Sequence, residues 1–555
     1  MHSMFKKLFL VFLLIIPCLS ICSGCSGDGI LSIQIDIASQ SNTFNPLKDD
    51  SLAYLNLTIY NGDEVTNYAS QYVQGEPMDM GQVDVGNFDR IVLSGHTLSG
   101  GLVAYGDMSY DGKISSDEET SVSVPFRYPL VYLAGTRLLH IFHPYRTSDL
   151  GGYTPISMAN DGEITTAVAT SPDGISVLGT SVNKGTGAIN IWLAFSMNNV
   201  KSIEVALGVD EPVKAIKFSS DGKFAVLTSP EGNYIKIVNV HNFIAFTAKE
   251  DSILHIDLDE SPSRPIDAAF TTSGKLAVLL SEDFSYNTCN NAPSSSVHFF
   301  TLADNLGADG GATDEGVTVS TDYISSMVSN PVDGRLFLSH PCAASISQVT
   351  AGSQVISPML NVNNLLPCFK PVNLAVGDNT LFSTCYTVAD TISPTWTEAK
   401  LLIQRFSLMS GSLTGNPLIM DYPQEAFYAN ATSSHPSGTI QHIQSAETLL
   451  PKDFTVTVKS GRIALSIEAY FNIRSVNVGG SVLNGFKRKT HSLLFIDPSA
   501  EAVSNRFRSA CYSVLSETDP PPAELTSSYC APMANVFQPT IEFIPGSVAS
   551  LYGFQ

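Results

Sequence analysis

The sequence predicts an all-β protein. Short runs of β-branched and aromatic residues are separated throughout by clusters of Gly, Pro, Asn, Asp and Ser, which is the pattern of strands joined by turns. Apolar residues at the helical spacing of three and four are almost absent. Hydrophobic residues make up 44% of the 555 positions and charged residues 15%. The chain can therefore bury large cores, and its length predicts at least two domains.

The first 25 residues form a targeting segment. Lys6 and Lys7 precede an apolar run over residues 8–16, and small residues follow before Cys25, which is the layout of a cleaved secretory signal. The apolar run is shorter than the roughly 20 residues of a membrane span. Residues 1–25 resemble the signal peptide and lipobox of bacterial lipoproteins. This resemblance implies that the cysteine after the cleavage site carries lipid, which would hold the protein on a membrane.

Cys25 is favoured as the lipidated residue over Cys22. Gly24 lies directly before Cys25 and is a small residue of the kind that signal peptidases prefer, whereas the bulky Ile21 lies directly before Cys22. Cys22 stays open as the alternative. In the family that the segment resembles, a residue such as Ser26 after the modified cysteine implies an outer-membrane location. We therefore expect a lipid-anchored protein of the cell envelope, on its periplasmic or its surface face.

Acidic residues outnumber basic ones, 52 against 30, for a net charge of −22. Nucleic acids and anionic lipid headgroups bind proteins through a basic electrostatic field, so neither is expected as a partner. The acidic residues are scattered, and no second apolar stretch long enough to cross a membrane follows the targeting segment. The membrane contact that we expect is therefore the lipid anchor.

Six cysteines follow the targeting segment, and an even count in an exported chain favours disulfides. Nearness in the sequence favours two pairs, and elimination leaves the third. The pairs are Cys368–Cys385, Cys511–Cys530 and Cys289–Cys342. Six cysteines allow fifteen pairings, so the connectivity stays open.

A small β-sandwich is predicted ahead of the remaining chain, over residues 26–127. Apolar and polar residues alternate strongly in 31–37 and 54–60, as they do in strands with one buried face. About a hundred residues with six or seven such strands fit an Ig-like sandwich. Pro125 and Pro129 mark its exit.

One sequence unit recurs between residues 128 and 510. Alternating apolar residues enter a tight polar turn that contains Gly, an apolar-rich strand leaves it, and a third strand usually follows. Gly accepts the positive φ of such turns, and Asp, Asn or Ser hydrogen-bonds the turning backbone. The turns lie at 171–174, 219–222, 271–274 and 330–334, with weaker copies at 377–379 and 459–461.

This repeat is typical of β-propeller blades, each a sheet of about four strands. We predict a propeller over residues 128–555, with seven blades favoured and six as the alternative. Its first blade would begin in 130–142, and a C-terminal strand at 540–544 would close the ring against that blade. The Ser-Pro-Asp-Gly and Ser-Ser-Asp-Gly-Lys turns resemble those of YVTN-type and lactonase-like propellers.

Residues 107–118 resemble the calcium loop of an EF-hand. Oxygen ligands fall at the first, third, fifth, ninth and twelfth positions, the seventh offers a backbone carbonyl, and Gly112 stands at the sharp bend. The ligand set would be Asp107, Ser109, Asp111, Lys113, Ser115 and Glu118. Ser109 stands where Asp or Asn is usual, and the flanks have the pattern of strands rather than helices. The alternative to a structural calcium site is a polar hairpin with an Asp-Gly turn.

The sequence carries no catalytic signature. Neither a Gly-x-Ser-x-Gly elbow nor a Cys-x-x-Cys among the six later cysteines occurs, so no sequence motif supports a hydrolase or a thiol redox enzyme. We expect a binding or scaffold module for a protein or small-molecule ligand. Inter-strand loops carry the function of propellers, and the long ones lie near 281–296, 303–322, 386–400 and 409–450.

The alternative is a lactonase-like propeller enzyme that acts on a small molecule at the channel mouth. Acidic, His and Arg side chains from three or more blades, converging at that mouth, would favour the enzyme.

Overall fold

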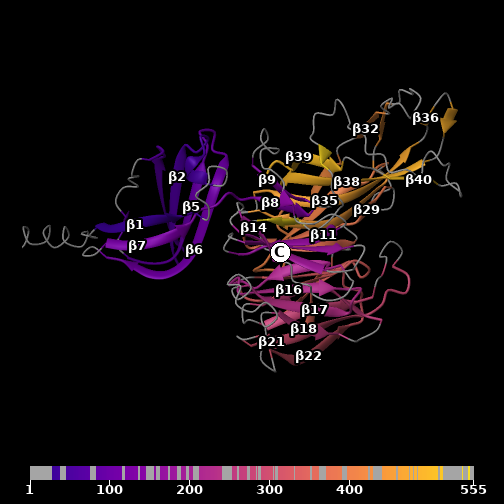
Figure 1. Cartoon of the computed structure of the whole chain (residues 1–555), viewed down its shortest axis with the longest axis horizontal. Helices are drawn as coiled ribbons and strands as arrows, with labels where there is room; N and C mark the ends of the chain where they lie inside the picture. Colours follow the sequence, from indigo (N-terminus) through magenta and orange to yellow (C-terminus); the bar gives the residue numbers. More distant parts are fainter. Residues whose placement is uncertain are drawn as a thin grey trace, which may run out of the picture. The chain divides into compact units, whose positions relative to one another are not determined.

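The structure, a computed structural model, consists of two compact units, Met1–Tyr128 and Pro129–Gln555 (Figure 1). It describes residues 28–37, 45–75, 83–84, 86–115, 119–134, 138–145, 156–157, 163–172, 176–183, 189–195, 199–203, 212–240, 253–258, 262–271, 275–282, 284, 289–303, 306, 311–330, 332–350, 353–361, 370–389, 397–422, 425–428, 441–444, 446–457, 461–473, 476–478, 481–483, 486–509, 513–516, 540–541 and 548–550. Among these residues no helix is both long and apolar enough to cross a membrane. The targeting segment, with Cys22 and Cys25, lies outside them.

The first unit contains two β-sheets, with the strand orders β3-β2-β5-β6 and β4-β1-β7. Neighbouring strands are antiparallel except β1 and β7, which are parallel. Buried apolar residues come from both sheets, among them Leu55, Ile91, Val103 and Val124. The strands are β1 (Asp28–Asp36), β2 (Tyr54–Asn61), β3 (Glu64–Gln71), β4 (Val83–Asp84), β5 (Gly86–His96), β6 (Leu102–Ile114) and β7 (Glu119–Pro125), with a 3-10 turn, η1, at Pro46–Lys48.

Gly106 allows the two sheets of the first unit to meet. A Cβ atom on Gly106, in β6, would lie 1.7 Å from the carbonyl oxygen of Pro125 at the end of β7. Any other residue at position 106 would therefore push β6 and β7 apart. Next to this crossing, the buried Arg127 donates to the Oδ2 atom of Asp36 at 2.9 Å, which fixes the end of β1.

The second unit is built from sheets whose neighbouring strands are antiparallel, apart from one parallel pair in the last sheet, and follow one another in chain order in most of the sheets. Its described strands form seven sheets of four or more strands, and two short hairpins stand apart from them. The first sheet contains β8 (Val131–Ala134), β9 (Leu138–Phe142), β10 (Ile156–Ser157) and the C-terminal β42 (Val548–Ser550), and the second contains β11 (Glu163–Thr170), β12 (Ser176–Asn183), β13 (Ile189–Phe195) and β14 (Asn199–Ile203). The third contains β15 (Ala215–Phe218), β16 (Phe224–Ser229), β17 (Tyr234–Asn239) and β18 (Ile253–Asp257), and the fourth contains β19 (Arg264–Phe270), β20 (Lys275–Ser281), β21 (Ser295–Leu302) and β22 (Ala312–Ser320). The fifth contains β23 (Ser326–Ser329), β24 (Leu336–His340), β25 (Ser345–Val349) and β26 (Ile356–Asn361), and the sixth contains β27 (Pro371–Gly377), β28 (Thr380–Cys385), β30 (Lys400–Ser407) and β31 (Leu418–Asp421).

The last sheet is the largest. Its main strands are β34 (Thr448–Val456), β35 (Ile463–Ile473), β38 (Phe486–Asp497) and β39 (Ala502–Ser509), joined by the short β29 (Thr387–Val388), β40 (Ser513–Ser516) and β41 (Thr540–Ile541). The two separate hairpins are β32 (Glu425–Tyr428) with β33 (Gln441–Gln444), and β36 (Val476–Val478) with β37 (Ser481–Leu483).

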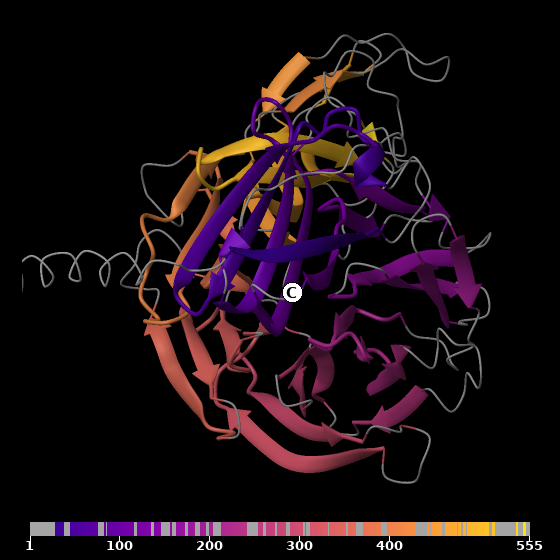
Figure 2. The same ribbon diagram turned by 90° about the vertical axis from the view of Figure 1, so that its left-hand side faces the viewer.

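The second unit is a β-propeller, as the repeat predicted. The inner strands of the sheets contact one another in the cyclic order β42, β11, β15, β19, β23, β27, β34 and back to β42, so the sheets stand around a ring (Figure 2). The core lies between neighbouring sheets. One apolar cluster, for example, joins Val226 and Ile237 of the third sheet to Val278 and Phe300 of the fourth.

The predicted turn chemistry is visible between β15 and β16. Gly222 has φ +69°, and the backbone N–H of Phe224 donates to the Oγ atom of Ser219 at 2.9 Å. The Asp221 carboxylate accepts from the Ser219 hydroxyl at 2.6 Å and from the N–H of Lys223 at 3.0 Å. Although burial acts in the opposite direction, these hydrogen bonds hold the pKa of Asp221 below its usual value. The turn is therefore specified by its own few residues.

The strand that closes the ring is not the one predicted at 540–544. Thr540 and Ile541 form β41, which pairs in parallel with β39 of the last sheet. The closing strand is β42, which pairs antiparallel with β8 and supplies the inner strand of the first sheet. β42 spans three residues, too few for a pattern of alternation to mark it.

Candidate functional site

The propeller has one edge of tight turns and one edge of long connections. Successive antiparallel strands reverse direction, so alternate connections lie at opposite edges of the ring. Connections from first to second strands share one edge, which we call the turn edge. Connections from second to third strands, and from each sheet to the next, share the opposite edge, which we call the loop edge. First-to-second connections are short throughout, as in 219–223, 330–335 and 378–379.

The longest connections gather at the loop edge of the last two sheets. The three longest are 386–399, 422–447 and 510–547, and the shorter 474–485 lies at the same edge. The short strands β29, β32, β36 and β40, which belong to these connections, lie on the same side of the second unit (Figure 1). Of the loops predicted as a binding surface, 281–296, 386–400 and the 422–447 part of 409–450 lie at the loop edge. The stretch 303–322 instead leaves β21 at the turn edge and forms β22.

A buried carboxylate lies at the middle of β35. Glu468 is 2% exposed. Its Oε1 atom accepts a short hydrogen bond from the Tyr470 hydroxyl. Its Oε2 atom lies 3.5 Å from Nζ of Lys452 and 3.8 Å from Nδ1 of His491. A carboxylate this deeply buried requires such partners, because unpaired burial of a charge costs several kcal/mol.

Lys452 reaches Glu468 through a β-bulge. The register between β34 and β35 shifts between Pro451 and Asp453, which leaves Lys452 as the extra residue, and a bulge redirects side chains in this way. The neighbouring carboxylate of Asp453 accepts from the N–H of Phe454 at 2.9 Å, which stabilises the local backbone of the bulge.

Tyr386 and Lys370, at the loop edge of the preceding sheet, are linked to this site through Tyr470, whose pKa the charge of Tyr386 raises. The N–H of Tyr386 donates to the carbonyl of Lys370 at 2.9 Å, and Nζ of Lys370 lies 5.5 Å from the centre of the Tyr386 ring. Burial raises the pKa of Tyr386 and lowers that of Lys370. Burial, the hydrogen bond to Glu468 and the charges of Glu468 and Tyr386 raise the pKa of Tyr470. We call these six residues the Glu468 cluster: Lys370, Tyr386, Lys452, Glu468, Tyr470 and His491.

The start of the long 422–447 connection is also held by buried polar groups. The Tyr422 hydroxyl and the Ser492 hydroxyl share a hydrogen bond of 2.9 Å. The guanidinium of Arg506, which is 2% exposed, lies 5.0 Å from the centre of the Tyr422 ring. The connection therefore leaves the sheet from a fixed point.

The Glu468 cluster was not predicted from the sequence. Its one local signal is a charged residue inside the apolar run of β35, where Glu468 interrupts Ala464-Leu465-Ser466-Ile467 and Ala469. Its acidic and His side chains come from the last sheet, and Tyr386 and Lys370 flank the sheet before it. Within the described residues, no group of three or more His, Cys, Asp or Glu is arranged to hold a metal ion.

The predicted calcium segment is a strand over most of its described length. Asp107, Ser109, Asp111 and Lys113 belong to β6, and Ser115 follows its end. Arg90 donates through Nε to the Asp107 carboxylate at 2.8 Å and forms an ion pair with it. The carboxylate of Asp107, the first candidate ligand, is therefore already paired with Arg90.

Glu118 of the calcium segment lies outside the described residues, so calcium binding stays a prediction. An unchanged melting temperature in EDTA would count against it.

Cys289 and Cys342 form a disulfide, as elimination predicted. Cys289 lies in the β20–β21 connection and Cys342 in the β24–β25 turn, so the bond joins neighbouring sheets at the loop edge. Cys385 is also disulfide-bonded. Cys368, Cys511 and Cys530 lie outside the described residues, so their predicted pairings stay predictions.

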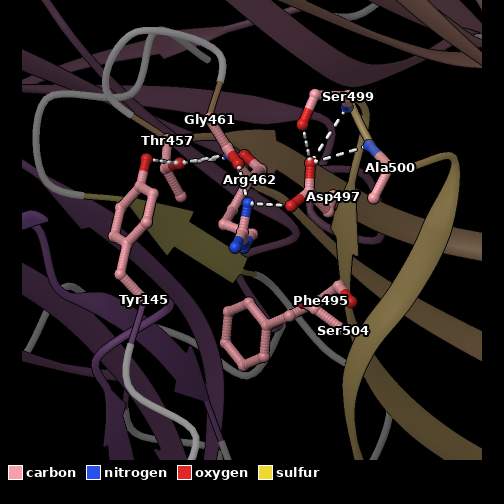
Figure 3. A network of polar contacts seen from close by, with 9 residues as sticks. All are labelled: Tyr145, Thr457, Gly461, Arg462, Phe495, Asp497, Ser499, Ala500 and Ser504. Carbon is pink, nitrogen blue, oxygen red and sulfur yellow. Dashed lines mark hydrogen bonds and ion pairs between the residues drawn. The ribbon is translucent and has the colours of Figure 1, made fainter. Parts of the chain in front are cut away.

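A second polar network joins the first and last sheets at the turn edge (Figure 3). Tyr145, which follows β9, shares a hydrogen bond of 2.8 Å with the Thr457 hydroxyl. Nη1 of Arg462 lies 2.7 Å from Oδ2 of Asp497, and its guanidinium lies 5.3 Å from the centre of the Tyr145 ring. Burial raises the pKa of Tyr145 to about 12. This network reinforces the closure of the ring by β42.

No protein-family model and no curated protein matches this chain. Solved structures with a similar fold include a dihydro-heme d1 dehydrogenase, NirN, in complex with DHE (12% identity, 69% of this chain and 73% of that chain, TM-score 0.36) and Sqt1 from Chaetomium thermophilum (12% identity, 80% and 94%, TM-score 0.36). A nidogen/laminin complex matches 52% of this chain and 92% of that chain at 9% identity and a TM-score of 0.31. At these scores the similarities carry no conclusion about function, and the propeller is assigned from its strand order.

Proposed function

We propose that this protein is a lipid-tethered binding or scaffold module of the cell envelope. In this proposal an Ig-like sandwich follows the lipidated cysteine as a spacer, and a seven-bladed propeller presents its loop edge to a protein or small-molecule ligand. The observation that carries the proposal is that the three longest connections, 386–399, 422–447 and 510–547, lie at the loop edge of the last two sheets. Binding surfaces on propellers are built from such connections.

A loop-edge variant tests the binding surface. Replacing residues 423–445 with a short Gly-Ser linker removes the β32–β33 hairpin and leaves β31 and β34 in place. The matched control replaces 241–252, at the turn edge, with the same linker. We expect membrane proteins or ligands that co-purify with the parent in detergent to be lost from the first variant and retained by the control. Equal retention by both variants would contradict a loop-edge binding site.

Mass spectrometry of the mature amino terminus tests the tether. We expect a terminal Cys25 that carries acyl chains, abolished by Cys25→Ser and unaffected by the control Cys22→Ser. The reverse result would identify Cys22 as the lipidated residue. An unmodified amino terminus in the parent would refute the lipid anchor.

The second candidate is a lactonase-like enzyme. The Glu468 cluster supplies groups for proton transfer, because a buried carboxylate lies beside Tyr470, Lys452 and His491, but the residues of the cluster come from two sheets rather than from three or more. Hydrolysis of a panel of small lactones, followed by proton release, would measure it. Glu468→Gln should abolish any turnover, whereas Glu501→Gln, an exposed change at the turn edge, should not. Turnover that survives Glu468→Gln would exclude this cluster as the catalytic site.

A further inference from the structure

A cavity of about 450 Å3 runs along β18, the outermost strand of the third sheet. Five consecutive residues, 254–258, line one wall, and His298, Phe300, Ala312 and Asp314 of the fourth sheet line the other. The volume lies within the range of about 300–1,000 Å3 that is usual for ligand pockets. A wall made of consecutive residues of one strand fits an extended chain better than a compact ligand.

The backbone of β18 offers hydrogen-bonding groups on the side away from its sheet. The N–H of Leu258 donates to the carbonyl of Asn233, towards β17. Hydrogen-bonded residues alternate along an antiparallel pair, so Ile256 and Leu254 also bond towards β17, whereas the N–H and C=O groups of His255 and Asp257 point outward. In the described part of the chain, β18 has no strand partner on that outer side.

The surfaces beside this edge are apolar on one side and acidic at the rim. Leu254 and Ile256 pack against the apolar cluster of the third and fourth sheets, which includes Phe300. The rings of His298 and Phe300 stack 6.4 Å apart. Asp314 is exposed, and the Asp257 side chain is 79% exposed and bonded to Nε2 of His255. Apolar side chains at alternate positions and at least one cation would complement these surfaces.

The same ring already accepts an added strand on another outer edge. β39 ends the main ladder of the last sheet, and β41 pairs with it in parallel, with Arg508 opposite Thr540 and Ser509 opposite Ile541. An outer strand of this propeller is therefore geometrically able to take a further strand.

We propose that an extended peptide segment of a partner protein pairs with β18 as a fifth strand of the third sheet. Its alternate apolar side chains enter the cavity against Phe300, and a basic side chain pairs with Asp257 or Asp314. This site is separate from the loop edge, so it stands or falls independently of the function proposed above.

Fluorescence anisotropy with a labelled, end-blocked nine-residue peptide of alternating valine and lysine tests the proposal. We expect saturable binding, and a loss of affinity of roughly tenfold or more when alternate backbone amides on one side are N-methylated. Methylation of the other alternate set should leave the affinity within about threefold. Equal effects of the two sets, or equal binding of a valine–glutamate peptide, would overturn the proposal.

Protein variants locate the site. Ala312→Leu narrows the cavity and should weaken binding at least tenfold, whereas the exposed Ala303→Leu is the matched control. Should Ala312→Leu fail to fold, His255→Pro removes an outward N–H while sparing the ladder to β17, and it should weaken binding to the same extent. Undiminished binding to a folded variant, or self-association through this edge in place of peptide binding, would contradict a peptide site.

Discussion

Burial keeps the His340 imidazole neutral. His340 is 3% exposed, and its Nε2 atom lies 2.6 Å from the Ser347 hydroxyl. Burial lowers its pKa from 6.5 to about 4. The unfolded chain binds this proton below about pH 6.5 while the folded chain still excludes it. The contribution of His340 to stability is therefore full above pH 6.5 and is lost as the pH falls towards 4.

Replacing His340 should reduce the loss of unfolding free energy that occurs as the pH falls from 7 to 4. We expect the parent to lose up to about 3 kcal/mol of unfolding free energy between pH 7 and pH 4 through this residue. In His340→Gln that part of the loss should disappear, although the variant starts from a lower stability. Urea unfolding at pH 7, 5.5 and 4 measures both slopes. Parallel profiles for parent and variant would show that His340 does not titrate in this window.

Gly461 makes room for the Tyr145 hydroxyl at the junction of the first and last sheets. A Cβ atom at position 461 would lie 2.5 Å from that hydroxyl oxygen. We expect Gly461→Ala to lower the unfolding free energy by about 1–3 kcal/mol through overpacking. Gly461→Ala should lower the unfolding free energy by less in a Tyr145→Phe background, because the hydroxyl that the added Cβ atom would meet is then absent.

A double-mutant cycle by urea unfolding measures this coupling. Gly86→Ala is the control, since a Cβ atom there would meet nothing within 4 Å. Additive effects of the two changes at 145 and 461 would contradict a direct contact.

At the scale of elements, the Cys289–Cys342 disulfide holds two sheets together. The two residues are 53 positions apart, and closing a loop of that length in the unfolded chain corresponds to about 4 kcal/mol. We expect the double change Cys289→Ser and Cys342→Ser to lower the unfolding free energy by about 2–4 kcal/mol. Urea unfolding without reductant measures it, with the exposed Ser294→Ala as the control. Unchanged stability would show that the fourth and fifth sheets dock without this bond.

The elements that could be predicted from the sequence are those specified by neighbouring residues. The turn from Ser219 to Phe224 needs only its own side chains and a glycine, and its recurrence predicted the propeller. The Glu468 cluster could not be predicted, because it depends on a bulge at Lys452 and on residues of two sheets.

The candidate calcium segment shows how one pattern can serve two structures. Ligands at every second position, as at Asp107, Ser109 and Asp111, have the same spacing as the residues on one face of a strand. The sequence alone therefore does not separate the calcium loop from the strand that the structure places there.

At the scale of the whole molecule, the ring depends on three residues at its C-terminal end. β42 pairs with Val131, Tyr132 and Leu133 of β8, and the apolar side chains of Val131 and Leu133 pack with Phe495 of the last sheet. The first sheet therefore takes its inner strand from one end of the chain and its other strands from residues some four hundred positions earlier.

Removing the closing strand should open the ring. We expect deletion of 546–555 to lower the unfolding free energy by at least about 2 kcal/mol, since backbone pairing and the cover over β8 are lost. Deletion of 551–555, which leaves β42 intact, is the matched control. Thermal melting and limited proteolysis of the first sheet measure the effect. Equal stability of the two deletions would show that β42 is dispensable.

This closure also determines when the protein can finish folding. Synthesis delivers β8 about four hundred residues before β42, so the first sheet lacks its inner strand while the other sheets of the ring are made. A contact between such distant positions carries a high loop-closure cost and is slow to form. Until it forms, the edge of β8 is an open template for pairing with other chains. The newly made chain is therefore most prone to aggregation in the interval between the synthesis of β8 and that of β42.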